Sequence, residues 1–125
     1  MRRGSVNTIA PSRGKLVRDR IPEIIGASGA VAVIRTLDSR EFEEALREKL
    51  VEEVAELSAA SGDQIAGEVA DVFEVIDAFC AFHRVSMDEI RSIRRAKAEE
   101  RGVLDRRVYL IETRQVGAPE QPTGG

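Results

Sequence analysis

Two amphipathic segments joined by a very short turn, residues 39–60 and 64–83, constrain the fold of this chain more than any other feature. At about 100° per residue, the apolar residues of each segment fall on one face. The first face consists of Phe42, Leu46, Leu50, Val54 and Leu57. The second consists of Val69, Val72, Phe73, Ile76, Phe79 and Cys80. Two such faces across so short a turn predict antiparallel helices that pack against each other.

Capping boxes mark the starts of three predicted helices. The boxes are Asp38 with Glu41, Ser61 with Gln64, and Ser86 with Glu89. They open helices over residues 39–60, over residues 64–83, and over a segment that ends near residue 101, where Gly102 follows. A shorter helix is predicted over residues 22–25, because proline is tolerated in the first turn of a helix.

Two short segments rich in β-branched residues, 31–37 and 107–113, predict strands that pair with each other. A two-stranded ribbon is marginal in water, so we expect it to pack on the helices or on a partner chain. The predicted fold class is mainly α, an antiparallel helical bundle with a small two-stranded β-ribbon.

The length of 125 residues fits one domain. We expect that domain over residues 13–116, between disordered tails over residues 1–12 and 117–125. No apolar run reaches the ~20 residues of a membrane-spanning helix, and no apolar stretch follows the basic N-terminus. The one cysteine, Cys80, has no partner for an intrachain disulfide and is expected in the core. These features predict a cytoplasmic protein with no membrane partner.

Acidic residues are concentrated in the middle of the chain. The whole chain has a net charge of -3, whereas residues 38–77 contain thirteen acidic and three basic residues. Glu53 falls within the first apolar face, and Glu56 and Lys49 lie near its edge. An ionised carboxylate on a packing face is costly unless a metal ion, a lysine or protonation compensates it.

Glu68 lies at the edge of the second apolar face, and Asp71 lies beyond that edge, one turn further along the same side. If the helices pack antiparallel, they face Glu53 and Glu56. Carboxylates crowded in this way suit Mg²⁺, which takes oxygen ligands and keeps waters that can meet a phosphate. The alternative is an ordinary solvated acidic face, and spacing alone does not decide between the two.

Three motifs resemble those of a known family. Glu52-Glu53-Val54-Ala55-Glu56 followed by Glu68-Val69-Ala70-Asp71 resembles the EExxE…ExxD signature of the all-α nucleoside triphosphate pyrophosphohydrolase superfamily (MazG-like). The opening K-L-V-R-D-R-I-P, residues 15–22, and the closing R-R-A-K-A-E-E-R-G, residues 94–102, resemble its phosphoribosyl-ATP pyrophosphohydrolase-like branch. The resemblance extends over about residues 15–113.

The resemblance implies Mg²⁺-dependent hydrolysis of a nucleotide to a monophosphate and pyrophosphate, with Mn²⁺ as a substitute, by a homodimer or higher homo-oligomer. The implied metal ligands are Glu53, Glu56, Glu68 and Asp71. Glu52 and Glu53 are the implied catalytic residues, with Glu52 binding a further ion or assisting the attacking water. The basic residues predicted to bind the nucleotide are Lys15, Arg18, Arg20, Lys49, Arg94, Lys97 and Arg101. Val103 stands where the branch usually has a second glycine, which leaves the substrate preference open.

The alternative function is a non-catalytic nucleotide- or nucleic-acid-binding helical protein. Basic residues are frequent in residues 91–107, but acidic residues interleave with them. A surface that tracks a phosphate backbone is expected to carry a more uniform positive charge. Binding to duplex nucleic acid is therefore not expected.

Overall fold

The computed structural model describes residues 14–117. The predicted tail of residues 1–12, and all but the first residue of the predicted tail of residues 117–125, lie outside this range. The described residues form four α-helices and one short 3₁₀ helix. In chain order these are α1 (Ile21–Ala27), α2 (Ser39–Ala59), η1 (Gly62–Gln64), α3 (Ile65–His83) and α4 (Met87–Arg101).

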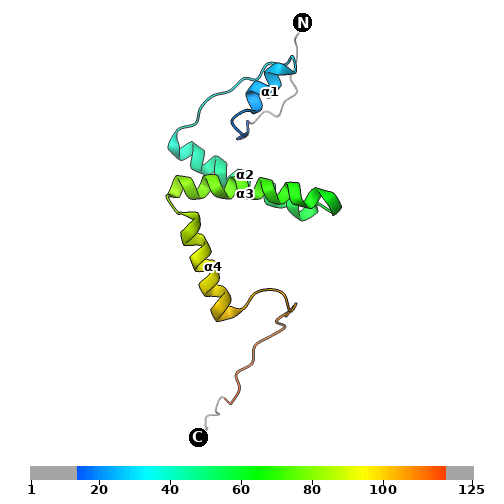
Figure 1. Ribbon diagram of the computed structural model, residues 1–125, viewed down its shortest axis with the longest axis vertical. Helices are drawn as coiled ribbons and strands as arrows, with labels where there is room; N and C mark the ends of the chain where they lie inside the picture. The colour runs from blue at the N-terminus through cyan, green and yellow to red at the C-terminus, as the bar shows by residue number, and fades with distance from the viewer. Residues whose placement is uncertain (1–13, 118–125) are drawn as a thin grey trace. The chain divides into compact units, whose positions relative to one another are not determined.

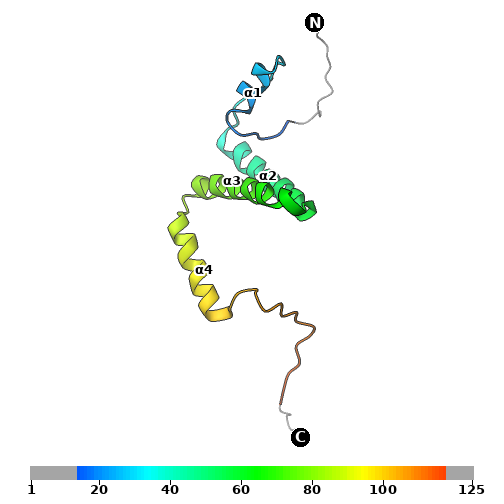
Figure 2. The same cartoon turned by 45° about the vertical axis from the view of Figure 1, so that its right-hand side comes forward.

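The chain divides into two compact units, Met1–Met87 and Asp88–Gly125. In the first unit, α2 and α3 lie side by side and run antiparallel, as both views show (Figure 1, Figure 2). This arrangement confirms the predicted helical hairpin. The second unit contains most of α4 and the segment that follows it.

The start of α2 is the predicted capping box. The Asp38 carboxylate accepts a hydrogen bond from the backbone N–H of Glu41 at 2.9 Å, and the Glu41 carboxylate accepts one from the backbone N–H of Asp38 at 3.1 Å. Arg35 donates two further hydrogen bonds to Glu41, at 2.9 and 3.1 Å. The two bonds between Asp38 and Glu41 satisfy backbone donors that the start of a helix leaves without partners, and the Arg35 bonds hold the Glu41 carboxylate in place.

Removal of this cap should destabilise the first unit. We expect Asp38→Ala to lower the free energy of unfolding by about 1 kcal/mol, because one backbone N–H of the first turn loses its acceptor. Asp38→Asn, which keeps a side-chain oxygen, should stay close to the native protein. Urea unfolding followed by circular dichroism measures both variants, and an alanine variant as stable as the native protein would contradict the capping role.

Two further predicted signals are present at helix ends, one of them with a change. The box of Ser61 and Gln64 is present, but it opens η1, and α3 begins one residue later at Ile65. At the end of α4, Gly102 has a φ of +83° and donates its N–H to the carbonyl of Ala98 at 2.8 Å. A positive φ at this position favours glycine, as expected for a helix C-terminus.

The apolar core of the described residues is small and lies between α2 and α3. Its buried members are Leu46, Val72, Val75 and Cys80. Leu46 is 1% exposed and is the largest fully buried side chain. Cys80 is a buried free thiol, which confirms its predicted core position. Phe42 and Phe82 extend the core with an edge-to-face contact, their ring centroids 5.7 Å apart.

The predicted β-ribbon is wrong. Residues 31–37 and 107–113 form no strand, and no strand occurs anywhere in residues 14–117. The apolar side chains of both segments are mostly exposed: Val33 is 93% exposed and Ile111 is 88% exposed. The preference of β-branched residues for strands arises largely from packing against a neighbouring strand and a core. Neither segment has such a neighbour here, so local composition alone does not produce a strand.

Among the described residues, no helix is both long and apolar enough to cross a membrane.

Candidate functional site

Three glutamates of the α2–α3 hairpin converge at one place, which we call the acidic cluster: Glu53 and Glu56 from α2, and Glu68 from α3. One carboxylate oxygen from each lies within 4.8 Å of the others. Glu53 and Glu56 are about one turn apart on α2, so they project to the same side, and the antiparallel packing brings Glu68 opposite them. The structure thus brings together three of the four predicted metal ligands.

Glu53 is the most unusual member of the acidic cluster because it is a buried carboxylate. The residue is only 6% exposed. Its Oε2 lies 3.3 Å from the Nζ of Lys49, whereas its Oε1 has no hydrogen-bond partner among the residues that the structure describes. The Oε1 of Glu68 is buried and without a partner in the same sense. Buried carboxylate oxygens normally have partners, so these two are suited to a ligand.

Among the described residues, Lys49 is the basic side chain that forms ion pairs with Glu52 and Glu53. Its Nζ lies 3.3 Å from Glu53 and 3.9 Å from Glu52. A single lysine offsets only part of the negative charge of the neighbouring carboxylates. Glu52 lies outside the group of three whose oxygens converge. Its predicted catalytic role stays a prediction.

The electrostatic consequence is clearest at Glu56. The negative charge of Glu53 raises the pKa of Glu56 above its ordinary value of 4.5, and desolvation, Glu68 and Glu52 add to the effect. Lys49 acts in the opposite direction but more weakly. Such mutual repulsion is what a divalent cation relieves when it binds between carboxylates.

This repulsion predicts that the stability of the metal-free protein depends on pH. Because the pKa of Glu56 is higher in the folded chain than its ordinary value, its proton-linked stabilisation is complete below pH 4.5. It is lost as the pH rises through the raised pKa. We expect Glu53→Gln to lower the pKa of Glu56, which a carboxyl NMR titration measures. Glu44→Gln on the exposed side of α2 is the control, and an equal pKa in both variants would contradict this interpretation.

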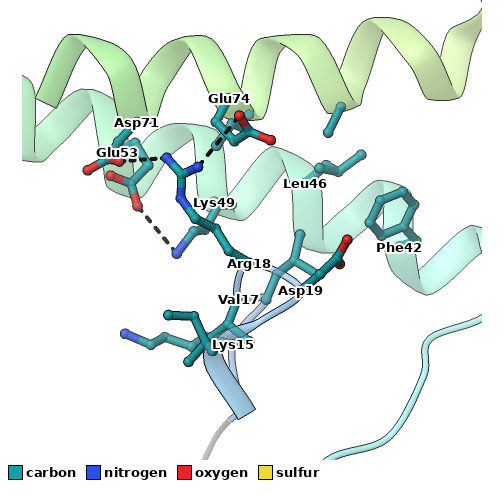
Figure 3. Close-up of a pocket in the computed structure, with 14 residues that line it drawn as sticks. Lys15, Val17, Arg18, Asp19, Phe42, Leu46, Lys49, Glu53, Asp71 and Glu74 are labelled. Atoms are coloured by element: carbon teal, nitrogen blue, oxygen red, sulfur yellow. Dashed lines mark hydrogen bonds and ion pairs between the residues drawn. The ribbon is translucent and has the colours of Figure 1, made fainter. Parts of the chain in front are cut away.

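Asp71, the fourth predicted ligand, lies outside the acidic cluster and bonds to Arg18 instead. The Nη2 of Arg18 donates to the Oδ1 of Asp71 at 2.8 Å, and its Nη1 lies 3.6 Å from the Oε1 of Glu74 (Figure 3). Arg18 comes from the segment that precedes α1, 53 residues away from Asp71 in sequence. This ion pair ties the N-terminal segment to α3.

A pocket of about 560 Å³ lies between this N-terminal segment and the α2–α3 hairpin. Its apolar walls include Phe42, Leu46 and Val75, and Glu53 and Asp71 lie at its polar end. Two predicted substrate-binding residues of the N-terminal segment, Lys15 and Arg18, also line it, as does Lys49. The pocket and the acidic cluster therefore share Glu53.

The remaining predicted site residues are placed as follows. Arg20 does not line the pocket and instead pairs with Glu23 at 3.0 Å on the surface of α1. Arg94, Lys97 and Arg101 lie on α4 in the second unit, and their role stays a prediction. Glu74 was not predicted as a site residue, although its position one turn after Asp71 is a signal that could have identified it.

The chain is similar to a known protein over part of its length. No protein-family model matches the chain, and no solved structure matches it. A 46-residue stretch, 37% of this chain, is 65% identical to an uncharacterized protein of Mycolicibacterium smegmatis. The match covers 47% of that protein, so the chain spans about half the length of this relative.

Proposed function

We propose that the protein is a Mg²⁺-dependent nucleotide pyrophosphohydrolase of the MazG-like kind. It hydrolyses a nucleoside triphosphate, or a related nucleotide such as phosphoribosyl-ATP, to a monophosphate and pyrophosphate. One observation carries the proposal: Glu53 has a buried Oε1 with no described partner, and one of its carboxylate oxygens lies within 4.8 Å of an oxygen from Glu56 and of one from Glu68. The resemblance of the EExxE…ExxD motif supports it.

The donor set of the acidic cluster fits Mg²⁺. All three side chains offer carboxylate oxygens, which are hard ligands of the type that Mg²⁺ and Mn²⁺ prefer. Glu53, Glu56 and Glu68 would hold the ion. Bound there, Mg²⁺ would neutralise charge on the phosphate oxygens and assist the attacking water.

The side chains around the pocket would bind the nucleotide and orient the attacking water. Lys15 and Arg18 are positioned to bind phosphate oxygens, and the apolar wall of Phe42 and Val75 is suited to the base or sugar of the nucleotide. Glu52 would orient the water. Water adds to a phosphorus, the anhydride bond between the α- and β-phosphates breaks, and pyrophosphate leaves.

A homodimer is part of this proposal. Several apolar side chains of the hairpin are exposed in the single chain: Val51 71%, Val54 43%, Ile65 45% and Phe73 62%. A small core beside so many exposed apolar residues is typical of a helical protein completed by a second copy. Sedimentation at micromolar concentration should show a dimer or a larger assembly, and a stable monomer would contradict this part.

Because nucleoside triphosphates are cytoplasmic metabolites, we propose a cytoplasmic protein.

The experiment that tests the function is pyrophosphate release from a panel of NTPs, dNTPs and phosphoribosyl-ATP. Each substrate is measured with Mg²⁺ and with a chelator in excess. We expect release from at least one nucleotide with Mg²⁺ and none with chelator. Release that does not depend on a metal, or binding of duplex DNA with no hydrolysis of any nucleotide, would contradict the proposal.

A further inference from the structure

Arg18 occupies a position where the predicted ligand set and the described geometry differ. Asp71 follows Glu68 by one turn of α3, so the two carboxylates lie on the same side of that helix. Glu68 joins the acidic cluster and Asp71 does not. What distinguishes Asp71 is its hydrogen bond at 2.8 Å from Arg18, whose guanidinium also lies 3.6 Å from Glu74.

At the polar end of the pocket, Lys49 and Arg18 therefore pair with different carboxylates (Figure 3). Lys49 lies against Glu53, and Arg18 lies against Asp71 and Glu74. A divalent ion placed next to Asp71 would be close to the guanidinium as well. Two cations that share one carboxylate repel each other, so binding of the ion at Asp71 opposes the contact with Arg18.

We propose that Arg18 is an internal counter-ion that holds Asp71 in the metal-free protein and that a divalent cation displaces it. This inference rests on the proposed function, in which the acidic cluster holds the ion, and it adds Asp71 as a further ligand of that ion once Arg18 has left. Displacement frees the guanidinium within the pocket that Lys15 also lines, where planar donors suit phosphate oxygens. Arg18 thus competes with the cation for Asp71 and, once displaced, becomes a binding residue for the nucleotide.

The exposure of the pair makes this exchange energetically easy. The side chain of Arg18 is 54% exposed and that of Asp71 is 42% exposed. An exposed ion pair contributes little to stability, so a divalent ion can replace it at small cost. By the same reasoning, removal of Arg18 should increase the affinity for the cation by about two- to fivefold.

The test is a titration of the full chain with Mn²⁺ alone, in which electron paramagnetic resonance measures the free ion. Arg18→Ala should bind Mn²⁺ about two- to fivefold more tightly than the native protein. Arg47→Ala is the matched control, since Arg47 bonds to Glu43 at the same distance of 2.8 Å but does not line the pocket. Its affinity should stay unchanged, and Arg18→Lys, which keeps the positive charge, should stay near the native value.

A double variant tests whether Arg18 and the cation compete for Asp71. In an Asp71→Asn background, Arg18→Ala should change the affinity for Mn²⁺ much less, because the shared carboxylate is gone. If Arg18→Ala does not fold, Arg18→Gln removes the charge while keeping a polar side chain. Unfolding or distortion weakens binding, so a gain in affinity separates competition from a merely structural role.

The outcomes also separate this inference from the proposed function. An Arg18→Ala variant that binds Mn²⁺ equally or more weakly overturns the counter-ion role, even if the native protein hydrolyses nucleotides. Tighter binding without hydrolysis of any nucleotide supports Arg18 and overturns the proposed function. A native protein that binds no Mn²⁺ overturns both.

Discussion

Glu53→Gln should reduce metal-dependent pyrophosphate release by about 100-fold or more, the largest effect on activity that we expect from a single substitution. The change replaces one charged oxygen with an amide and leaves the volume of the side chain nearly unaltered. Glu53 is buried, shared by the acidic cluster and the pocket, and has an oxygen with no described partner. The loss should therefore appear in cation binding as well as in turnover.

The matched control for this variant is Glu44→Gln. Glu44 lies on the same helix, but its side chain is 66% exposed, and its carboxylate lies 3.8 Å from Arg40, away from the acidic cluster. Both rates are measured at saturating nucleotide and over a range of Mg²⁺ concentrations, with circular dichroism to verify folding. Full activity of a folded Glu53→Gln variant, or an equal loss in Glu44→Gln, would contradict the assignment.

Leu46→Ala should have the largest effect on stability and lower the free energy of unfolding by about 3 kcal/mol. Leu46 is 1% exposed, and the core of the described residues contains few other buried apolar side chains. Truncation removes buried methyl groups and leaves a cavity in a core that has little other material to fill it. Because Leu46 also lines the pocket, nucleotide binding should weaken together with stability.

Chemical denaturation with Val33→Ala as the control tests this prediction. Val33 is 93% exposed, so its truncation should change the free energy of unfolding by no more than about 0.5 kcal/mol. If Leu46→Ala is as stable as Val33→Ala, Leu46 is not the centre of the core.

The helices could be predicted because their determinants are local. Asp38 and Glu41 lie within one turn of each other, and the apolar residues of α2 and α3 recur at helical spacing. The strand prediction fails, because a strand at residues 31–37 would need a neighbouring strand, and composition does not reveal whether one is there. The same distinction explains η1: the residue types of Ser61 and Gln64 predict a capping box, but they do not predict the tighter 3₁₀ helix that it opens.

The same distinction between local and distant determinants applies to the residues of the candidate site. Glu53 could be singled out from the sequence because a carboxylate within an apolar face is anomalous, and Glu68 follows from antiparallel pairing of two adjacent helices. The bond between Arg18 and Asp71 could not, since 53 residues separate them and no periodic pattern connects a loop with a helix. Arg20, with the same charge two positions away, has an entirely different partner in Glu23.

The most direct test of the central claim is a crystal structure of the protein grown with millimolar Mn²⁺ and measured at the manganese absorption edge. Our account predicts an anomalous peak between Glu53, Glu56 and Glu68, within bonding distance of the Glu53 Oε1 that has no described partner. The account would be contradicted by crystals in which these three carboxylates hold no manganese and Glu53 contacts only Lys49.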